Sequence, residues 1–359
     1  MITGNKGEWS EIYTLLKIIS DKNLFAGDSA LNKIEGLIFP IIKILRDESN
    51  GTYDYTYDND LIVISGDNEE FKIPINTFQE QAVFLLSKLK ETTTATFSIP
   101  EIETFMSSFK CVSLKAKSSV KSDIRIVIHD QRTGTTPELG FSIKSQLGKP
   151  ATLFNSSQGS NFIYKIDNVI LTEADVTEIN TLNTKSKIQD RVKLIISKGG
   201  TLNFQNTEGS IFQNNLTLID SLLPQVLADM IINFSTSQYN KLSDLVNEIE
   251  EKNPLNFDVS DNHNFYNYKI KRLLSDVALG MVPTTVWTGL LDSTGGYLVV
   301  KDDGEILCYH IYNRNEFEDY LLENTKIINP SSTRLKFAKI YKEGDDCYFK
   351  LNLQIRFIK

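Results

Sequence analysis

Apolar residues along the first third of the chain recur with the spacings of helices and strands. Residues 6–21 repeat them at helical spacing, which predicts an amphipathic helix. Residues 29–46 are also apolar and predict a second helix, which Pro40 kinks or divides because proline lacks the amide hydrogen that a helix interior uses. Residues 52–75 alternate between apolar and polar positions, as a hairpin does. Two more helices are expected over residues 77–90 and 100–109.

The strand pattern returns in the middle of the chain. Residues 123–128 and 139–146 predict two strands joined by a turn-rich connection, and residues 185–281 are mostly helical in pattern. After residue 290 the pattern turns back to strands. We therefore expect an α/β protein with a mostly helical stretch and a β-rich C-terminal region. The expected regions, with approximate boundaries, are residues 1–170, 171–290 and 291–359.

The composition is that of an ordinary soluble globular protein. Its 359 residues are 41% hydrophobic and 23% charged, which is enough to bury a sizeable core. No apolar run approaches the roughly 20 residues that span a bilayer, and the first residues lack the apolar segment of an export signal. Cys111, Cys308 and Cys347 are few and far apart, so we expect reduced thiols in a cytoplasmic protein with no membrane contact.

The charge of the chain bears on its partners. A formal net charge of −8 argues mildly against a general nucleic-acid coat protein, which is usually basic. It leaves room for a DNA enzyme that confines its basic groups to one cleft. Lysine and arginine gather in two stretches, which form either solvated faces or nucleic-acid contacts: Lys110, Lys115, Lys117 and Lys121, and then Arg334, Lys336, Lys339, Lys342, Lys350 and Arg356.

The two strands in the middle of the chain share one polar face. Because alternate residues of a strand lie on the same face, Ser142, Lys144 and Gln146 point away from the core side of the second strand. Asp123 heads the first strand, and Gly140 leaves clearance beside this face. Phosphodiester hydrolysis needs a carboxylate for a divalent metal, a group that orients water and positive charge at the phosphate. Asp123, Gln146 and Lys144 fit these needs, although a half-buried hairpin also exposes such residues without a catalytic role.

The position two residues before Lys144 lacks the acid that this arrangement usually has. Ser142 stands there, and a hydroxyl group does not replace a carboxylate as a ligand for a hard metal ion. A following helix offers no substitute, since no acidic residue occurs between Lys144 and Asp167. Glu138 is on the same strand face but lies about 13 Å away along the strand. The acids of the first helix are therefore the better candidates.

Glu8 and Glu11 lie on the first expected helix. At about 100° per residue, the apolar face centres between Ile12 and Ile19, with Glu8 near that centre and Glu11 near its edge. A carboxylate on an apolar face is costly to bury without a partner, and a metal ion would supply one. Glu8 is therefore the first candidate for the missing ligand and Glu11 the second. The alternative for Glu8 is an exposed first-turn acid that the helix dipole favours.

Three sets of residues form long motifs: residues 4–13 (GNKGEWSEIY), residues 123–125 (DIR) with 138–148 (ELGFSIKSQLG), and residues 150–155 (PATLFN). Together they resemble the HpaII family of type II restriction endonucleases. The chain length also matches, so the likeness runs from end to end. These motifs are much longer, and so more specific, than an Asp followed at a distance by a Lys.

The resemblance implies a PD-(D/E)XK nuclease core, which is a mixed central sheet flanked by helices, with residues 1–170 as the catalytic region and the helical stretch as an insertion. It implies Mg²⁺-dependent cleavage of double-stranded DNA at a short palindrome, which is CCGG for the HpaII type. The implied catalytic residues are Asp123 and Lys144, with Glu8 or Glu11 as the helix acid that such folds often add; Ser142 and Gln146 complete the candidate set. Asp123 and Glu8 are the expected metal ligands. A companion DNA methyltransferase in the host follows from the same resemblance, which leaves monomer and homodimer open.

Two segments are candidates for contact with DNA. The loop at residues 155–161 follows the catalytic strand and is rich in short donor side chains, although turn-forming residues need no function. Residues 349–357 alternate regularly, and their polar face carries no acid, which suits either a phosphate-rich partner or a solvent-exposed edge strand. Arginine reads guanine edges, so Arg334 and Arg356 are the candidates for guanine contacts in CCGG. The full candidate set is Asn155, Ser156, Ser157, Asn161, Arg334, Lys350, Asn352, Gln354 and Arg356.

Two other functions stay open on the sequence alone. Ser142 in place of an acid also suits a catalytically inactive DNA-binding module. The same fold also serves repair nucleases that act on DNA branches or ends. Incubation of plasmid DNA with Mg²⁺ separates the three: a discrete fragment ladder, binding without cleavage, or non-specific degradation.

Overall fold

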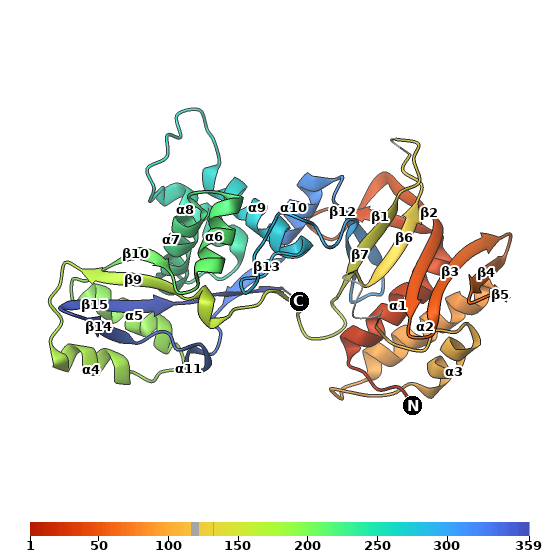
Figure 1. The fold of residues 1–359 in the computed structure, drawn as a ribbon, viewed down its shortest axis with the longest axis horizontal. Helices are drawn as coiled ribbons and strands as arrows, with labels where there is room; N and C mark the ends of the chain where they lie inside the picture. The colour runs from red at the N-terminus through yellow and green to blue at the C-terminus, as the bar shows by residue number, and fades with distance from the viewer. Residues whose placement is uncertain (116–121, 132, 359) are drawn as a thin grey trace. The chain divides into compact units, whose positions relative to one another are not determined.

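A computed structural model describes residues 1–115, 122–131 and 133–358, and these form two compact units (Figure 1). Unit 1 comprises Met1–Ala151 and Leu291–Tyr320. Unit 2 comprises Thr152–Leu290 and Leu321–Ile358. The units differ from the three consecutive regions expected from the sequence, because the chain after residue 290 first returns to unit 1 and then completes unit 2.

The described part of unit 1 is organised by a mixed sheet of nine strands in the order β1-β12-β11-β7-β6-β2-β3-β4-β5, in which β1 also pairs with β2. The β1–β12 and β11–β7 pairs are parallel, and the other pairs are antiparallel. The mixed sheet with its helices confirms the expected α/β class. The strands are β1 (Asn23–Gly27), β2 (Lys33–Glu48), β3 (Gly51–Asp58), β4 (Leu61–Gly66), β5 (Glu69–Pro74), β6 (Ile124–Ile128), β7 (Glu138–Ser145), β11 (Gly296–Val300) and β12 (Ile306–His310).

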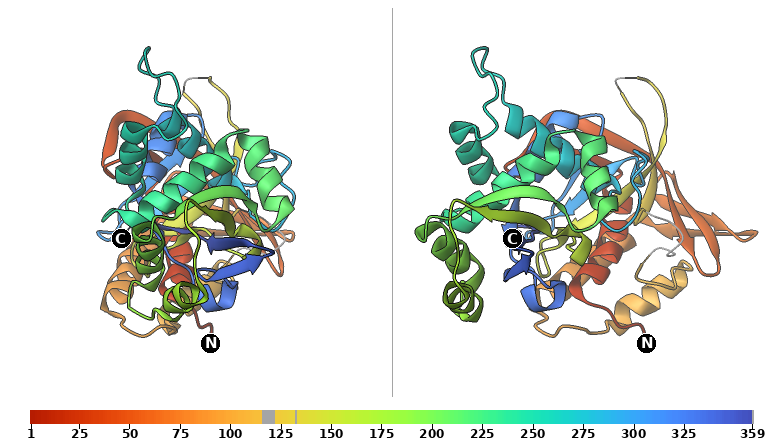
Figure 2. Two further views of the ribbon diagram at one scale, coloured as in Figure 1. Left: turned by 90° about the vertical axis from the view of Figure 1, so that its left-hand side faces the viewer. Right: turned by 60° about the vertical axis from the view of Figure 1, so that its left-hand side comes forward.

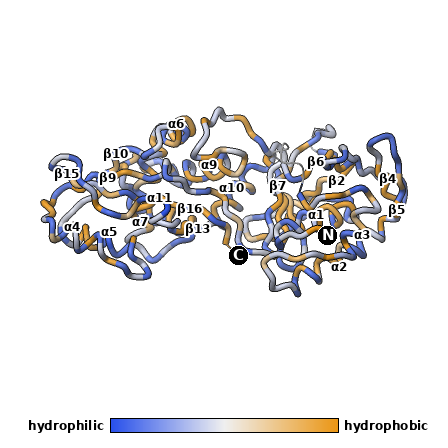
Figure 3. The backbone as a smooth tube through the Cα atoms, turned by 60° about the horizontal axis from the view of Figure 1, so that its bottom comes forward, coloured by the Kyte–Doolittle hydropathy of each residue, from blue (hydrophilic) through white to orange (hydrophobic). Residues whose placement is uncertain are grey.

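Helices α1 (Lys6–Asp21), α2 (Ile75–Glu91) and α3 (Pro100–Ser108) belong to the same unit, and α10 (Arg314–Glu323) begins in it. Helices α1, α2 and α3 confirm the three helices expected near residues 6–21, 77–90 and 100–109. α1 contacts β7 on one side and α2 on the other, so it lies between the sheet and a second helix. Its apolar side chains join those of β6 and β7 in one buried core. Figure 3 marks hydrophobic positions along these elements as orange stretches of the backbone tube.

Residues 29–46, expected as a kinked helix, instead form most of the long strand β2. The expectation was wrong because this segment is rich in isoleucine, a β-branched residue that packs well on a pleated surface. Pro40 stands where β2 passes from pairing with β1 to pairing with β6, and its carbonyl accepts a hydrogen bond from the amide of His129 (2.8 Å). A proline is tolerated at such an irregular position of a sheet.

The hairpin expected over residues 52–75 is confirmed by the antiparallel strands β3, β4 and β5, which extend from the sheet as a ribbon in Figure 2. The two strands expected over residues 123–128 and 139–146 are confirmed as β6 and β7, which pair antiparallel. The polar face deduced from their alternation therefore belongs to the middle of the unit 1 sheet.

As far as residues are described, unit 2 has a four-stranded sheet, β10-β9-β15-β14, and a three-stranded sheet, β13-β16-β8. The expected long final strand is divided, because β15 and β16 belong to different sheets. The mostly helical stretch after residue 185 also contains β10. The strands are β8 (Thr152–Phe154), β9 (Phe162–Asp167), β10 (Thr201–Thr207), β13 (Thr325–Ile328), β14 (Ile340–Glu343), β15 (Asp346–Leu351) and β16 (Gln354–Phe357).

The helices of unit 2 are a short 3₁₀ helix, η1 (Gln158–Ser160), and α4 (Glu173–Thr181), α5 (Lys187–Ser197), α6 (Ser210–Ile219), α7 (Leu223–Thr236), α8 (Leu242–Lys252), α9 (Phe265–Leu279) and α11 (Ser332–Leu335). Among the described residues, no single helix is long and apolar enough to cross a membrane; α6 and α7 reach that length and composition only as a pair, bent by 106°.

Candidate active site

Asp123 lies immediately before β6 and is fixed against the middle of β7. Its amide donates to the carbonyl of Phe141 (2.9 Å), and its carboxylate Oδ2 accepts a hydrogen bond from the amide of Ile143 (2.6 Å). Phe141 is fully buried, so this anchor rests on the core of the unit. The carboxylate of Asp123 therefore stands beside the strand segment that carries Ser142 and Lys144.

Lys144 is half-buried on β7. Burial lowers the pKa of Lys144, whereas the negative charges of Asp123 and Glu11 act in the opposite direction. Its Nζ lies 4.8 Å from the centroid of the Tyr297 ring on β11. Within the described ranges we find no hydrogen bond or ion pair to this ammonium group, so its three N–H donors can serve a ligand.

Glu11 comes to the same place from α1. Burial raises the pKa of Glu11 to about 8, and the negative charge of Asp123 adds to this rise. Its Oε2 atom is buried and has no hydrogen-bond partner among the described residues. A hydrogen bond between Ser10 Oγ and Ser145 Oγ (2.8 Å) ties this part of α1 to the end of β7. Two carboxyl groups and one amino group, from three segments of the chain, thus act on each other electrostatically.

Glu8 lies in the first turn of α1 and turns back toward its start. Its carboxylate pairs with Lys115 Nζ (2.8 Å) and accepts the amide of Asn5 (2.8 Å), which closes a capping box. These hydrogen bonds, that from Lys115 first, lower the pKa of Glu8. Its carboxylate does not point into the core below the apolar face, because the unpaired amides at the helix start draw the side chain to the cap. These contacts fit the alternative of a first-turn acid, although the side chain is half-buried rather than exposed.

The remaining candidates on β7 have separate partners. Ser142 Oγ is hydrogen-bonded to Ser293 Oγ (2.9 Å). Gln146 is held to β11 through its backbone amide, and its side chain is half-buried. Glu138 pairs with Arg125 Nη1 (2.6 Å), so its carboxylate is engaged away from the position of the missing acid. Of these three, only Gln146 has no described partner for its side chain.

Glu11 and Asp123 have the chemistry of a Mg²⁺ site. Mg²⁺ prefers oxygen ligands and commonly binds through one or two carboxylates while it keeps several waters. The partnerless Oε2 of Glu11, and the repulsion from Asp123 that raises the pKa of Glu11, are both relieved by a cation held by the two groups. In the part of the chain that the structure describes, no cluster of three or more His, Cys, Asp or Glu residues has metal-ligand geometry. The residues present therefore fit a two-carboxylate site completed by water and substrate oxygens.

The basic candidates for DNA contact lie in unit 2. Arg334 is exposed on α11, whereas Arg356 donates from Nε to Thr152 Oγ1 (3.1 Å). Lys350 Nζ pairs with Glu208 (3.2 Å). The polar face of residues 349–357 carries no acid of its own, as expected, but Glu208 supplies one from another segment. In the N-terminal basic stretch, Lys110 and Lys115 each pair with a glutamate, and Lys117 and Lys121 lie outside the described residues.

The loop after β8 is partly exposed. Asn155 is exposed, and its Oδ1 accepts a hydrogen bond from Gln354 Nε2 (3.5 Å). Ser157 caps η1 by accepting the amide of Ser160 (3.2 Å). Ser156 is half-buried, with an Oγ that has no hydrogen-bond partner among the described residues. Asn155, Ser156 and Gln354 stay predictions as DNA contacts, and Ser157 has a structural reason to be present.

Asn161 and Asn352 are buried rather than available to DNA. Their exposed fractions are 0% and 1%, and Asn352 Nδ2 donates to Asn161 Oδ1 (2.6 Å). Asn161 Nδ2 also donates to Glu208 (2.7 Å) and to the carbonyl of Leu335 (2.8 Å). Both amides therefore join loops inside unit 2, and their expected DNA contact conflicts with this burial. Asn352 follows the last residue of β15. The regular alternation of apolar and polar residues over 349–357 did not indicate that the strand ends there.

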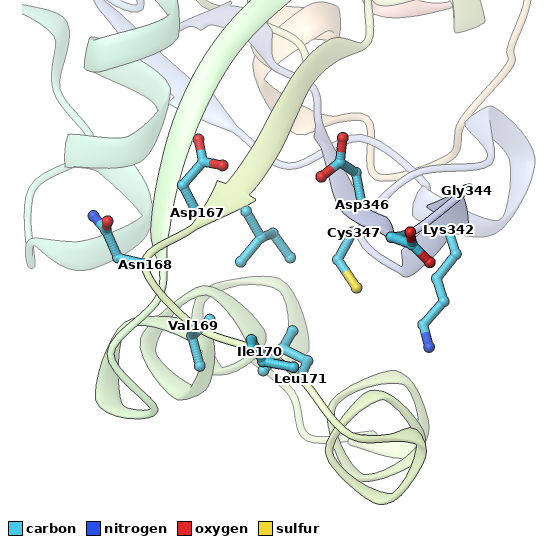
Figure 4. A pocket seen from close by; sticks show the side chains of 11 residues that line it. Asp167, Asn168, Val169, Ile170, Leu171, Lys342, Gly344, Asp346 and Cys347 are labelled. Atoms are coloured by element: carbon cyan, nitrogen blue, oxygen red, sulfur yellow. The ribbon is translucent and has the colours of Figure 1, made fainter.

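An open pocket of about 600 Å³ in unit 2 is a second place where charged groups gather (Figure 4). Asp167, Asp346 and Cys347 are among its lining residues. The carboxylate of Asp346 already pairs with Lys165 Nζ (2.9 Å), which is also 3.9 Å from that of Asp167. These paired charges give the pocket no reactive group comparable to the cluster in unit 1.

Tyr297 and Ser293 were missed by sequence reasoning. Both come from the chain after residue 290 and reach the site because β11 pairs with β7 in parallel. The apolar run that contains Tyr297 does indicate a buried strand. No residue pattern shows which earlier strand it joins, so neither side chain was a candidate.

Comparison with known proteins covers the whole site. The sequence model of the HpaII restriction endonuclease family matches residues 5–357. The chain is 51% identical over 359 residues to the type II restriction enzyme HpaII of Haemophilus parainfluenzae, with 99% of each protein covered. No solved structure matches the chain. The likeness noted in the short motifs thus extends through both units, and the chain belongs to the HpaII restriction endonuclease family.

Proposed function

We propose that this protein is a Mg²⁺-dependent endonuclease that cuts double-stranded DNA at the palindrome CCGG. The observation that carries the proposal is that the Asp123 carboxylate is hydrogen-bonded to β7 next to Lys144, while α1, tied by Ser10 to the end of β7, brings the carboxyl group of Glu11 close enough to act on both. Membership of the HpaII family supports the class of reaction and a specific site. The β6–β7 hairpin in a mixed sheet, with α1 packed against it, supports a PD-(D/E)XK core.

The proposed division of labour assigns one task to each side chain. Glu11 and Asp123 would hold Mg²⁺, which when bound would supply Lewis-acid activation of the scissile phosphate and of water. Lys144 presents unengaged N–H donors to the phosphate or the attacking water and neutralises developing negative charge. Gln146, on the same strand face, orients the water. Ser142 is not assigned the role of the missing acid, because a hydroxyl group does not replace a carboxylate as a ligand for a hard metal ion, and this hydroxyl is hydrogen-bonded to Ser293.

The choice of metal ligand therefore moves from Glu8 to Glu11. Glu8 is engaged by Lys115 through Oε1 and by the start of α1 through Oε2, so each of its oxygens already has a partner. Glu11 has a buried oxygen without a partner and interacts electrostatically with Asp123. Glu8 instead holds Lys115 near the site and fixes the start of the helix.

The proposed partners follow from the same activity. Exposed Arg334 is the first candidate for a guanine contact, and Arg356 and Lys350 would need to leave their present partners to join it. A palindromic target has two-fold symmetry, which a homodimer matches. A cell that makes such an enzyme needs a companion methyltransferase to protect its own CCGG sites, and both act in the cytoplasm where the DNA is.

A matched pair of duplexes tests the proposal. One carries a single CCGG site, and the other carries GGCC in the same flanks, so base composition and symmetry are unchanged. With Mg²⁺ we expect cleavage at one position in the first duplex and none in the second. Lys144→Ala is expected to abolish cleavage while it leaves DNA affinity in Ca²⁺ unchanged, because the lysine acts on the reacting phosphate.

Each other outcome selects a different function. Tight binding of the CCGG duplex by the wild type without cleavage in any divalent metal would indicate a DNA-binding module. Equal degradation of both duplexes would indicate a non-specific or repair nuclease. Cleavage by Lys144→Ala at the wild-type rate would remove this lysine from the mechanism.

A further inference from the structure

We infer that Tyr297 is a positioning residue that holds the ammonium group of Lys144 in its catalytic place through the face of its ring. The inference rests on the proposed nuclease function of Lys144. Tyr297 comes from β11 and has no place in the metal and lysine motif. Its exposed fraction is 2%, so it does not reach substrate itself.

The strand register places the two side chains on one face of the sheet. In the parallel β11–β7 pair, Tyr297 lies opposite Ser142 and Val299 lies opposite Lys144. Partners in register share a face, so Lys144 lies diagonally across from the Tyr297 ring. Its Nζ is 4.8 Å from the ring centroid, within the range of a cation–π contact. The short side chain of Ser142 leaves the ring face open to the lysine.

The ring is itself held in place. Its edge-to-face contact with Phe317 on α10 has a centroid separation of 5.4 Å and an interplanar angle of 80°. This contact and the burial of Tyr297 restrict rotation of the ring, so the face presented to Lys144 is fixed.

Lys144 differs from the other lysines that lie over aromatic rings. Each of those, among the described residues, also has an oxygen partner within 3.7 Å: Lys22, Lys33, Lys88, Lys110, Lys269 and Lys350. For Lys144 the described residues provide the ring contact and no oxygen within ion-pair distance, although Asp123 and Glu11 act on its charge from farther away. An aromatic ring attracts the cation electrostatically, but it does not accept hydrogen bonds from the N–H groups as a carboxylate does. Tyr297 can thus fix the position of the ammonium group and still leave its donors to the phosphate.

Two substitutions separate the ring from the hydroxyl group. Tyr297→Phe keeps the ring face, and Tyr297→Leu removes it. Under single-turnover conditions with the CCGG duplex and Mg²⁺, we expect the Phe variant to cut within about threefold of the wild-type rate and the Leu variant about tenfold more slowly. DNA affinity in Ca²⁺ should stay within about twofold in both, because the ring acts on placement of the lysine and not on binding.

Tyr55→Leu is the matched control for damage to the core. Tyr55 is 1% exposed on β3 of the same sheet, and its ring lies edge-to-face against Phe109 (6.1 Å between centroids) rather than beside Lys144. It should lose thermal stability as Tyr297→Leu does, yet retain the wild-type cleavage rate.

A spectroscopic readout makes the contact testable without catalysis. In protein labelled at lysine ¹³Cε, the ring current of Tyr297 should move the Lys144 Hε signals upfield; their loss in Lys144→Arg assigns them. The shift should persist in Tyr297→Phe and vanish in Tyr297→Leu. An unshifted Lys144 signal in the wild type, or a Leu variant that cuts as fast as the wild type, would overturn the inference. A shifted signal with no cleavage by wild type and Phe variant alike would instead refute the proposed function, and the role of Tyr297 with it.

Discussion

Burial of the Glu11 carboxyl group lowers the stability of the fold, but it places that group where it can bind a metal ion. In the metal-free protein its carboxyl group is desolvated beside Asp123, and its pKa rises to about 8 from the ordinary 4.5. A bound cation lets both carboxylates be ionised at neutral pH. The residue is therefore unfavourable to the metal-free fold and favourable to the metal-bound one, as is common at functional sites.

The pH dependence of stability should reveal this residue. A raised pKa in the folded state means that Glu11 contributes stability below about pH 4.5, and that the contribution is lost as pH rises through 8. Glu11→Gln removes that loss. In urea unfolding without divalent metal, we expect the variant to exceed the wild type at pH 8.5 by about 1–2 kcal/mol in unfolding free energy.

Glu8→Gln provides the opposite sign as a control. The pKa of Glu8 is lowered by Lys115 and Asn5, so Glu8 contributes stability above its ordinary pKa and loses it as pH falls. This variant should be less stable than the wild type at neutral pH, because it weakens the cap of α1. A Glu11→Gln protein that is less stable than the wild type at pH 8.5 would contradict the burial argument.

At the scale of elements, the β6–β7 hairpin depends on close packing at one glycine. A Cβ atom at Gly140 would lie 2.7 Å from Ser122 Oγ and 2.8 Å from Ser122 Cβ, so the residue next to Asp123 would have to move. Gly140→Ala should lower the unfolding free energy by about 1–3 kcal/mol and also slow DNA cleavage, since Asp123 shifts with its neighbour.

Gly148→Ala is the control just after the same strand. A Cβ there would stand 3.4 Å from Lys6 Cβ, which is ordinary van der Waals contact. Its unfolding free energy should stay within about 0.5 kcal/mol of the wild type. Chemical denaturation and cleavage assays on both variants check the expectation, and equal effects at the two glycines would speak against it.

The same elements show which parts of the fold could be predicted from the sequence. The hairpin and α1 could be predicted because their alternation and helical period are local. β2 was taken for a helix because a run of apolar residues is compatible with both structures, and only its pairing with β1, β3 and β6 decides between them. Glu8 was misplaced because a helical wheel does not represent the free amides at a helix start.

At the scale of the whole molecule, the site is assembled from segments far apart in sequence. α1, the β6–β7 hairpin and β11 meet only because β11 inserts next to β7. Tyr297 therefore lay beyond prediction, as did the burial of Asn161 and Asn352, which depends on contacts between the loops of unit 2. Asp123, Lys144 and the acids of the first helix were candidates because the hairpin and the first helix each carry a local pattern, to which the family resemblance added.

The central claim is that Glu11, together with Asp123, holds the metal that cleavage requires. The most direct measurement is the single-turnover cleavage rate of the CCGG duplex against Mg²⁺ concentration for wild type, Glu11→Gln and Glu8→Gln. We expect Glu11→Gln to lose on the order of a hundredfold or more in rate without recovery at high Mg²⁺, and Glu8→Gln to stay within a few fold. A Glu11→Gln enzyme with the wild-type rate and Mg²⁺ dependence, or a larger loss in Glu8→Gln, would contradict the claim.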